Sequence, residues 1–432
     1  MTGRCPWAAA GSLRGSAVRG SAVRGSAVRG SAVRGSAVRG SAVRGSALRA
    51  LRAATVPAVA ALLIAGCGSV AAGKPPSVPA AAPLPQLATA VTAAAGASWA
   101  IVVMGGASAQ ENDFWELFSR PAGTPKWRLA TPVGVADNGG IVAAVTGLNS
   151  LVTGFRPSQD LLFSPLASTA DGGASWSTGT LADPGLADVP DALAAGQGGQ
   201  LIALGQGGGA QLGSRLGTAW TKLASVQSLA STPAGRACGL TGLTAAAFGG
   251  PGGPLLAGRC GHPGIAGIFA LRSRTWTPAG PAIPAPLARG DVEVLRMGTT
   301  GPRTQVLLES GAGATASLLA AWSTDGGARW RLSAPLRPGS ATVRSASFGP
   351  GGAVGLVLGD GLGEALAGPG ASWRALPGLP RWTATLAVGP AGHLDALTAH
   401  GSSFADWRLA GGAASWSLAQ TLRVEIPYGS SS

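Results

Sequence analysis

A tryptophan that recurs about every fifty residues, and a glycine tetrad that recurs in phase with it, predict an all-β fold of seven repeated units. The periodic tryptophans are Trp127, Trp176, Trp220, Trp276, Trp330, Trp373 and Trp416. Short apolar runs of strand length flank tetrads such as Gly349–Gly352, whose glycines can adopt the positive φ angles of tight hairpin turns. One four-stranded unit per tryptophan is typical of a β-propeller, so the sequence predicts seven blades.

The expected bounds of the blades follow the tryptophan period. Each blade would have an inner strand, a second strand, a third strand and an outer strand that carries the tryptophan. We expect the blades at residues 99–135, 137–185, 189–230, 236–285, 290–338, 341–378 and 381–426. Together they form a propeller domain at 98–428, followed by a tail at 429–432. One domain can reach this size because each blade packs only on its neighbours.

The first 49 residues form a low-complexity leader with Gly-Ser-Ala-Val-Arg repeated six times at 15–44. A period of five gives neither a helix nor a strand a consistently apolar face, so we expect disordered chain. The leader also accounts for most of the formal net charge of +14, since residues 1–66 hold ten arginines and no acid. The rest of the chain is only mildly basic, which argues against a nucleic-acid partner.

Residues 50–66 have the apolar run of a signal peptide, which is too short to span a bilayer as a helix. The run ends in Leu63-Ile-Ala-Gly-Cys67, which resembles the lipobox of bacterial lipoproteins. The resemblance implies that Cys67 is lipidated and begins the mature protein; the alternative is an ordinary secretory signal. We therefore expect a lipid anchor in the cell membrane on its extracytoplasmic face. Residues 67–97, rich in proline and alanine, would be a flexible linker.

The cysteines of the folded part agree with export. Cys238 and Cys260 flank two predicted adjacent strands of one blade. In an oxidising compartment we expect them to form a disulfide, with two free thiols as the alternative. His262 is the only histidine nearby, so we expect no zinc site, and no phosphate-loop or dinucleotide motif predicts a cofactor.

Two of the periodic tryptophans close the same phrase, Thr-Ala-Asp-Gly-Gly-Ala-Ser-Trp at 169–176 and Ser-Thr-Asp-Gly-Gly-Ala-Arg-Trp at 323–330. The phrase resembles the Asp-box, or bacterial neuraminidase repeat, Ser/Thr-x-Asp-x-Gly-x-x-Trp. The matching positions are Thr169, Asp171, Gly173, Trp176, Ser323, Asp325, Gly327 and Trp330. The resemblance implies a structural turn on the outer rim of the propeller. The families that carry it include sialidases, xyloglucan-degrading hydrolases, sortilin-type receptors and photosystem assembly factors, so it predicts the fold and leaves the function open.

Catalysis finds little support in the sequence, and we assign no catalytic residue. Sialidase chemistry needs a tyrosine nucleophile, and the only tyrosine is Tyr428 near the C-terminus. A two-carboxylate glycosidase remains the alternative. The carboxylates that could serve it are Asp113, Glu116, Asp291, Glu293, Asp360, Glu364 and Asp395, the last beside His393.

The favoured hypothesis is a monomeric, non-catalytic binding or scaffold module for a protein or glycan of the cell envelope. Two irregular stretches, 112–118 and 154–160, supply the candidate binding residues Trp115, Arg156 and Asp160, because aromatic and arginine side chains are typical of recognition surfaces. The alternative for the first stretch is that its aromatic side chains belong to the core of the first blade.

Overall fold

The computed structural model describes residues 87–92, 97–105, 114–132, 135, 139–156, 163–182, 185–214, 219–249, 253–411 and 413–425. All of them belong to one compact unit, Gly73–Ser432. The predicted leader, signal peptide, lipidation site at Cys67 and C-terminal tail lie outside the described residues.

The described part of the chain is all-β apart from short helices, and most of its strands form four-stranded antiparallel sheets. Five sheets have four strands each. They are β5 (Ile141–Val145), β6 (Leu151–Phe155), β7 (Phe163–Thr169) and β8 (Ser177–Ala182); β9 (Leu193–Ala195), β10 (Gln200–Leu204), β11 (Gly209–Ser214) and β12 (Thr221–Ser225); β13 (Leu240–Gly249), β14 (Gly253–Cys260), β15 (Ile268–Arg272) and β16 (Thr275–Pro278); β17 (Val292–Thr300), β18 (Arg303–Ser310), β19 (Ser317–Ser323) and β20 (Arg331–Leu332); and β25 (Thr383–Val388), β26 (Leu394–His400), β27 (Ser403–Leu409) and β28 (Ser417–Arg423).

A sixth sheet has eight strands, because the first strand of the chain joins two four-stranded halves. The halves are β1 (Thr89–Thr92), β2 (Ser98–Met104), β3 (Phe114–Arg120) and β4 (Arg128–Leu129), and β21 (Val343–Phe348), β22 (Val354–Leu358), β23 (Gly363–Leu366) and β24 (Arg374–Leu376). They meet through two parallel pairs, Val91 with Phe348 and Ala88 with Ser345, while the other pairings between strands of the sheet are antiparallel.

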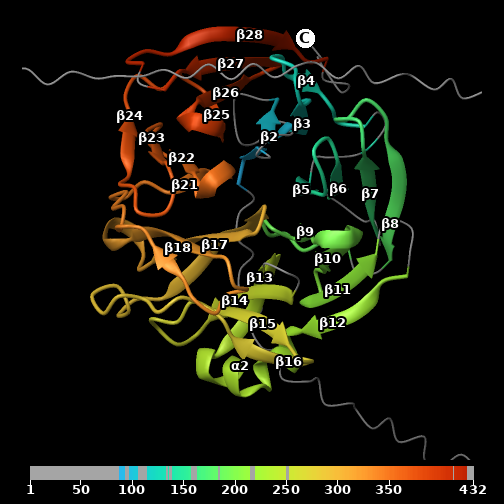
Figure 1. Ribbon diagram of the computed structural model, residues 1–432, viewed down its shortest axis with the longest axis vertical. Coiled ribbons are helices and arrows are strands. Elements are labelled where there is room, and N and C mark those ends of the chain that lie inside the picture. Colours follow the sequence, from blue (N-terminus) through green and yellow to red (C-terminus); the bar gives the residue numbers. More distant parts are fainter. Residues whose placement is uncertain are drawn as a thin grey trace, which may run out of the picture. The chain divides into compact units, whose positions relative to one another are not determined.

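The sheets surround a common centre, with first strands such as β9, β13 and β17 near it and last strands such as β8, β12 and β28 at the rim (Figure 1). Within the described residues, the glycine tetrads lie where the sequence predicts them, between the first and second strands. The tetrads that begin at Gly349 and Gly389 form 3-10 turns η3 (Pro350–Gly352) and η4 (Pro390–Gly392).

The fold begins earlier than the predicted boundary at residue 98. Leu87 and Ala90 are buried, and β1 lies within the segment expected to be linker. Thr89 Oγ1 donates to the carbonyl of Ala346 (2.9 Å), and the N–H of Ala90 donates to Ser347 Oγ (2.8 Å). The alanine- and proline-rich composition around this short strand hid it from the sequence, because its burial depends on strands more than 250 residues away.

The first and last four-stranded units pack directly on each other. Phe118 of β3 stacks on Phe404 of β27, with ring centroids 3.9 Å apart, and Trp127 meets Phe404 edge-on. The side chain of Gln420 accepts from the N–H of Trp127 and donates to its carbonyl, both at 2.8 Å. These contacts join the last unit to the first, so that the first unit has a neighbouring unit on both sides.

The periodic tryptophans join neighbouring units. Three of them donate their indole N–H groups to carbonyls that follow the preceding sheet: Trp330 to Ala279 (2.6 Å), Trp373 to Ala334 (2.9 Å) and Trp416 to Pro377 (3.3 Å). The buried indole nitrogens of Trp127 and Trp220 have no hydrogen-bond partner among the described residues. The sequence period therefore marks a contact that recurs at successive boundaries between units.

Two short helices interrupt the β-structure where the sequence predicts only strand and connection. They are α1 (Val226–Ala230) and α2 (Pro233–Cys238), which follow β12. Ser225 caps α1, and Thr232 caps α2 with Pro233 in its first turn. Gly239 ends α2 in the left-handed conformation, with φ 65°. These capping residues were the available sequence signal for the helices.

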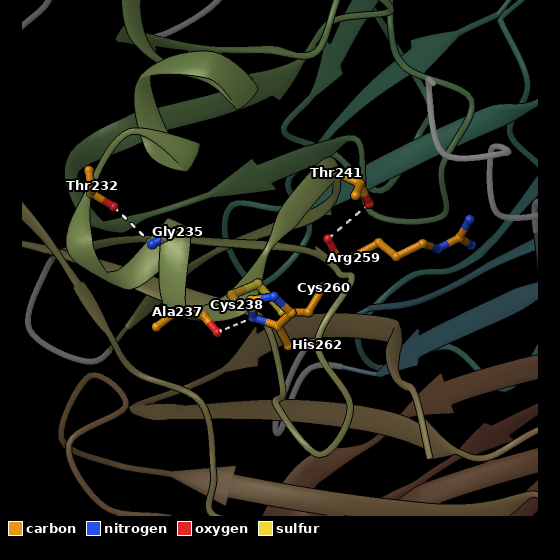
Figure 2. Close-up of a disulfide and its surroundings, with 8 residues drawn as sticks. All are labelled: Thr232, Gly235, Ala237, Cys238, Thr241, Arg259, Cys260 and His262. Carbon is orange, nitrogen blue, oxygen red and sulfur yellow. Dashed lines mark hydrogen bonds between the residues drawn. A yellow bond between two sulfur atoms is a disulfide. The ribbon is translucent and has the colours of Figure 1, made fainter. Parts of the chain in front are cut away.

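A disulfide ties the second helix to the neighbouring sheet (Figure 2). It joins Cys238, at the end of α2, to Cys260, at the end of β14. The predicted partners are therefore bonded, although Cys238 lies in a helix rather than a strand. His262 lies beside the bridge and its Nδ1 donates to the carbonyl of Ala237 (2.7 Å).

Candidate functional site

The two Asp-box phrases form the same hydrogen-bonded turn. Asp171 Oδ1 accepts from the backbone N–H groups of Ala174 (2.9 Å) and Ser175 (3.0 Å), and Thr169 Oγ1 accepts from the N–H of Gly173 (2.9 Å). In the second copy, Asp325 Oδ1 accepts from the N–H of Arg329, and Ser323 Oγ from that of Gly327, both at 2.9 Å.

The aspartates of both phrases are bound to their own turns. Hydrogen bonds from Ser175 hold the pKa of Asp171 well below its usual range, and backbone donation from Arg329 lowers the pKa of Asp325. A carboxylate held in this way is a poor proton donor or acceptor at neutral pH. The geometry therefore assigns these residues to the fold.

The fifth residue of each box must be glycine. Gly173 has φ 88°, and a Cβ there would lie 2.9 Å from the Cβ of Ala130 in the preceding unit. Gly327 has φ 81°, and its Cβ would lie 3.0 Å from the carbonyl oxygen of Ala279. Each box thus combines a left-handed backbone with close approach to a neighbour.

The predicted binding residues do not form an exposed surface. Trp115 is half-buried in β3 and packs against a core that includes Trp99. Arg156, expected in an open loop, is only 4% exposed. Its Nη1 contacts Asp188 (2.6 Å) and the carbonyl of Ala187 (3.1 Å), and burial lowers its pKa to about 10. Asp160 lies outside the described residues.

Four of the carboxylates that the sequence indicates for a glycosidase lie in three sheets: Glu116 and Glu364 in the eight-stranded sheet, Glu293 in the β17–β20 sheet and Asp395 in the β25–β28 sheet. Glu116 is buried and accepts from Thr131 Oγ1 (2.5 Å), Asp395 pairs with Arg120 (2.5 Å), and Glu293 pairs with Arg259. Burial raises the pKa of Glu364. Asp113 lies outside the described residues.

The centre of the ring is almost filled. A channel of about 60 Å³ lies among the first strands of the sheets, β1, β5, β9, β13, β17 and β21. Asp191 and Arg296 lie in it as a buried ion pair with an N–O distance of 3.5 Å. Burial raises the pKa of Asp191, which also accepts from the N–H of Met297 (2.5 Å). This volume suits one or two water molecules, so the channel is no substrate pocket.

Two larger clefts open beside the β25–β28 sheet. One, of about 620 Å³, lies against β23 and the turns η3 and η4, and glycine, proline and alanine supply most of its lining, with Arg374 as its only charged side chain among the described residues. The other, of about 650 Å³, lies on the outer part of β26–β28. Both volumes fall within the range of about 300–1,000 Å³ that is typical of ligand sites.

The second of these, which we call the aromatic cleft, is lined by Trp382, His400, Trp407, Trp416 and Leu418 among other residues. Trp382 precedes β25, His400 ends β26, Trp407 lies in β27 and Leu418 in β28. Trp382 is 58% exposed and Leu418 is 53% exposed, unusual values for large apolar side chains. The fold thus brings together the indoles of Trp382, Trp407 and Trp416, of which only Trp416 is one of the periodic tryptophans.

Trp382 has an unusual backbone conformation. Its φ of 65° places a bulky residue in the left-handed region, at a cost of about 1–3 kcal/mol. The indole stacks on the imidazole of His400, with ring centroids 4.4 Å apart and an interplanar angle of 15°. The N–H of Ala399 donates to the carbonyl of Trp382 (3.1 Å), and Thr383 Oγ1 donates to that of Pro380 (2.6 Å). The backbone around Trp382 is therefore fixed from both sides.

The polar groups of the aromatic cleft are mostly hydroxyls. Thr398, Ser403, Ser415 and Thr421 contribute them. Arg381 adds a guanidinium 5.7 Å from the ring centre of Trp382, and among the described residues no carboxylate lines this cleft or the 620 Å³ cleft. The arrangement can hold a molecule with an apolar face and hydroxyl or anionic groups, and it offers no proton donor of the carboxylic type. Neither Trp382 nor Arg381 belongs to a periodic pattern of residues.

The described residues hold no group of three or more histidine, cysteine, aspartate or glutamate side chains that could bind a metal ion. Nor do any of their helices have the length and apolar character needed to cross a membrane.

No protein-family model and no curated protein matches the sequence. The chain is similar in structure to a GH74 xyloglucanase from Xanthomonas campestris, with 14% identity and a TM-score of 0.49 over 75% of this chain and 52% of that enzyme. It therefore spans about half the length of the xyloglucanase.

Two other solved structures match this chain over nearly the whole of their own length. YCF48 from Cyanidioschyzon merolae has 12% identity and a TM-score of 0.42 over 76% of this chain and 94% of that one. A protein from Lactobacillus plantarum has 10% identity and a TM-score of 0.49 over 76% and 96%. These similarities are consistent with a β-propeller and concern the fold alone.

Proposed function

We propose that this protein is a membrane-anchored lipoprotein on the extracytoplasmic face of the cell membrane. Its folded part would be a monomeric, seven-bladed Asp-box propeller that binds a protein or glycan of the cell envelope without catalysis. The blades would be the five four-stranded sheets and the two halves of the eight-stranded sheet.

The observation that carries the binding function is the lining of the two large clefts. Among the described residues, apolar, aromatic and hydroxyl side chains with single arginines surround them, and no carboxylate does. Acid–base cleavage of a glycosidic bond needs two carboxyl groups around one bond, whereas binding needs only shape and complementary contacts. The clefts thus support a binder over a hydrolase.

The experiment uses the full chain purified in detergent and a fraction of solubilised cell envelope. We expect the chain to retain a defined envelope component on an affinity support, and to release no reducing sugar from the same fraction. Chain denatured before immobilisation is the control for nonspecific retention. Absence of specific retention, or release of sugar by the native chain alone, would contradict the proposal.

The anchor is tested separately through Cys67. Two acyl chains bind a bilayer firmly, because each buried CH₂ contributes about 0.8 kcal/mol. We expect C67A to appear in the soluble extracellular or periplasmic fraction, while the unchanged chain fractionates with membranes. If C67A stays with the membranes to the same extent, the lipoprotein assignment is wrong.

A pair of glutamates keeps glycosidase activity as a second candidate. Glu293 and Glu309 are direct cross-strand partners in β17 and β18, and burial together with the charge of Glu293 raises the pKa of Glu309. A carboxyl with a raised pKa beside a second carboxylate is the usual feature of such an enzyme. Hydrolysis of an envelope glycan that E309Q abolishes, and that D360N leaves unchanged, would favour this candidate.

A further inference from the structure

Trp382 combines two features that the fold does not require. More than half of its side chain is exposed, and its backbone adopts a conformation that bulky residues rarely occupy. Three of the periodic tryptophans, by contrast, donate their indole N–H groups to neighbouring units, and the other four are buried in the core or partly buried against it. A large apolar side chain held outward in a strained conformation is typical of a ligand contact.

The surroundings of Trp382 hold its ring in one orientation. His400 supports it by stacking, and the hydrogen bond from Ala399 to its carbonyl fixes the backbone. A preorganised ring loses little conformational freedom when a ligand packs on it, which favours affinity. Trp407, Trp416 and Leu418 extend the apolar surface along the same cleft.

Arg381 gives the cleft a charge. Its side chain is exposed, and its only recorded contact among the described residues is with the ring of Trp382. Five other arginines of the propeller pair with carboxylates: Arg120, Arg156, Arg259, Arg296 and Arg408. Among the described residues, the guanidinium of Arg381 thus has no carboxylate partner, and no acidic residue lines the cleft. Such a site complements a ligand that carries a carboxylate.

We infer that the aromatic cleft binds an acidic polysaccharide, a glycan chain that contains uronic acid residues. The C–H face of a sugar ring packs on the exposed indole of Trp382, the sugar hydroxyls bond to the serine and threonine hydroxyls of the rim, and the uronate carboxylate pairs with Arg381. This inference rests on the proposed binding function and specifies its ligand.

A sugar chain fits this cleft better than a peptide does. The cleft is open and shallow enough to leave Trp382 and Leu418 more than half exposed, and four hydroxyls surround the rings. A pyranose presents an apolar face and a hydroxyl edge together, which matches flat indoles beside hydroxyls. A helical peptide would need a continuous apolar groove for its i, i+3 and i+4 side chains instead.

The test measures binding of the full chain in detergent to a panel of oligosaccharides by calorimetry. The panel holds oligomers of galacturonic, glucuronic and mannuronic acid, and the same oligomers with every carboxylate methyl-esterified. We expect at least one acidic oligomer to bind at least tenfold more tightly than its ester, and its affinity to fall as salt concentration rises. Equal affinity for acid and ester throughout, or no binding to any acidic oligomer, overturns the inference.

Variants connect the binding to the cleft. We expect R381Q to remove the preference for the acid over its ester, and R337Q, at an exposed arginine that lines neither cleft, to preserve it. W382G accepts the left-handed backbone, so it should fold normally and still lose at least tenfold in affinity for acid and ester alike. The control is L362A, which removes an equally exposed apolar side chain outside the cleft. Unchanged binding in a folded W382G overturns the inference.

The two proposals fail separately. If the full chain still retains an envelope component while no acidic oligomer binds, the binding function stands and the ligand assignment is wrong. If neither is observed, both are wrong.

Discussion

Asp406 lies at the contact between the first and last four-stranded units, and its environment makes the stability of that contact depend on pH. The side chain is completely buried in β27, where it accepts from Arg408 through Nε (3.1 Å) and Nη2 (2.9 Å). Its Oδ1 has no hydrogen-bond partner. Asp395, on the adjacent β26, pairs with Arg120 of β3 (2.5 Å) and lies 3.6 Å from Arg408. Burial and the charge of Asp395 raise the pKa of Asp406 to about 6.

The sign and size of the effect follow from this pKa. The ordinary value is 3.8, so between pH 3.8 and about 6 the folded chain binds more protons than the unfolded chain. Stability therefore decreases as pH rises through this window. A difference of about two pKa units corresponds to about 3 kcal/mol, which is present below pH 4 and lost above pH 7.

The assay compares the unchanged chain with D406N, whose side chain is neutral at every pH. Free energies of unfolding from urea denaturation at pH 4.5, 6 and 7.5 give the difference between the two proteins. We expect D406N to gain about 2 kcal/mol on the unchanged chain between pH 4.5 and 7.5, with most of the gain complete by pH 6. D171N is the contrasting control, because the lowered pKa of Asp171 gives stability that is lost as pH falls below 3.8. A difference between D406N and the unchanged chain that does not vary with pH would refute the reasoning.

Three further substitutions test how the turns, the disulfide and the aromatic cleft contribute to stability. G173A should destabilise the fold by about 2–4 kcal/mol, because it adds a close contact to an unfavourable φ. G123A is the control, with φ 78° and open space around its Cβ, and should cost only about 1 kcal/mol. Urea denaturation measures both free energies. Replacing Cys238 and Cys260 together by serine should cost about 3 kcal/mol, the entropy of closing a loop of 22 residues, and a loss well under 1 kcal/mol would be contrary to this estimate. W382G should change the free energy of unfolding by less than about 1 kcal/mol, since relief of the backbone offsets the lost stacking, whereas a loss of 3 kcal/mol would assign the indole to the fold.

The parts of the structure that repeat were accessible from the sequence. A tryptophan that contacts the preceding unit must recur once per unit, so its period indicates the units themselves, as Trp330 and Trp373 show. The start of the fold was not accessible, because the short strand β1 lies between the nearby strand β2 and the distant strand β21, where Ala346 and Ser347 accept its hydrogen bonds. Local composition has no information on contacts of that range.

The predicted binding residues illustrate the same limit. Arg156 lies in an irregular, polar stretch, and such stretches are usually exposed. Here the neighbouring segment at Ala187 and Asp188 covers the guanidinium, a contact that no local pattern predicts. The capping residues of α1 and α2 were visible in the sequence, but the period of the blades outweighed them.

Departures from the repeat are the better guide to function in this fold. A residue that recurs at the same place in successive units is explained by a contact that every unit needs, as with the tryptophans and the Asp-box turns. Trp382 is not periodic, its φ of 65° is one that bulky residues rarely adopt, and its neighbour Arg381 has no carboxylate partner among the described residues. Selection for stability alone would favour glycine at this φ and a smaller, polar side chain at this exposure. The inferred ligand contact accounts for an exposed tryptophan at this position.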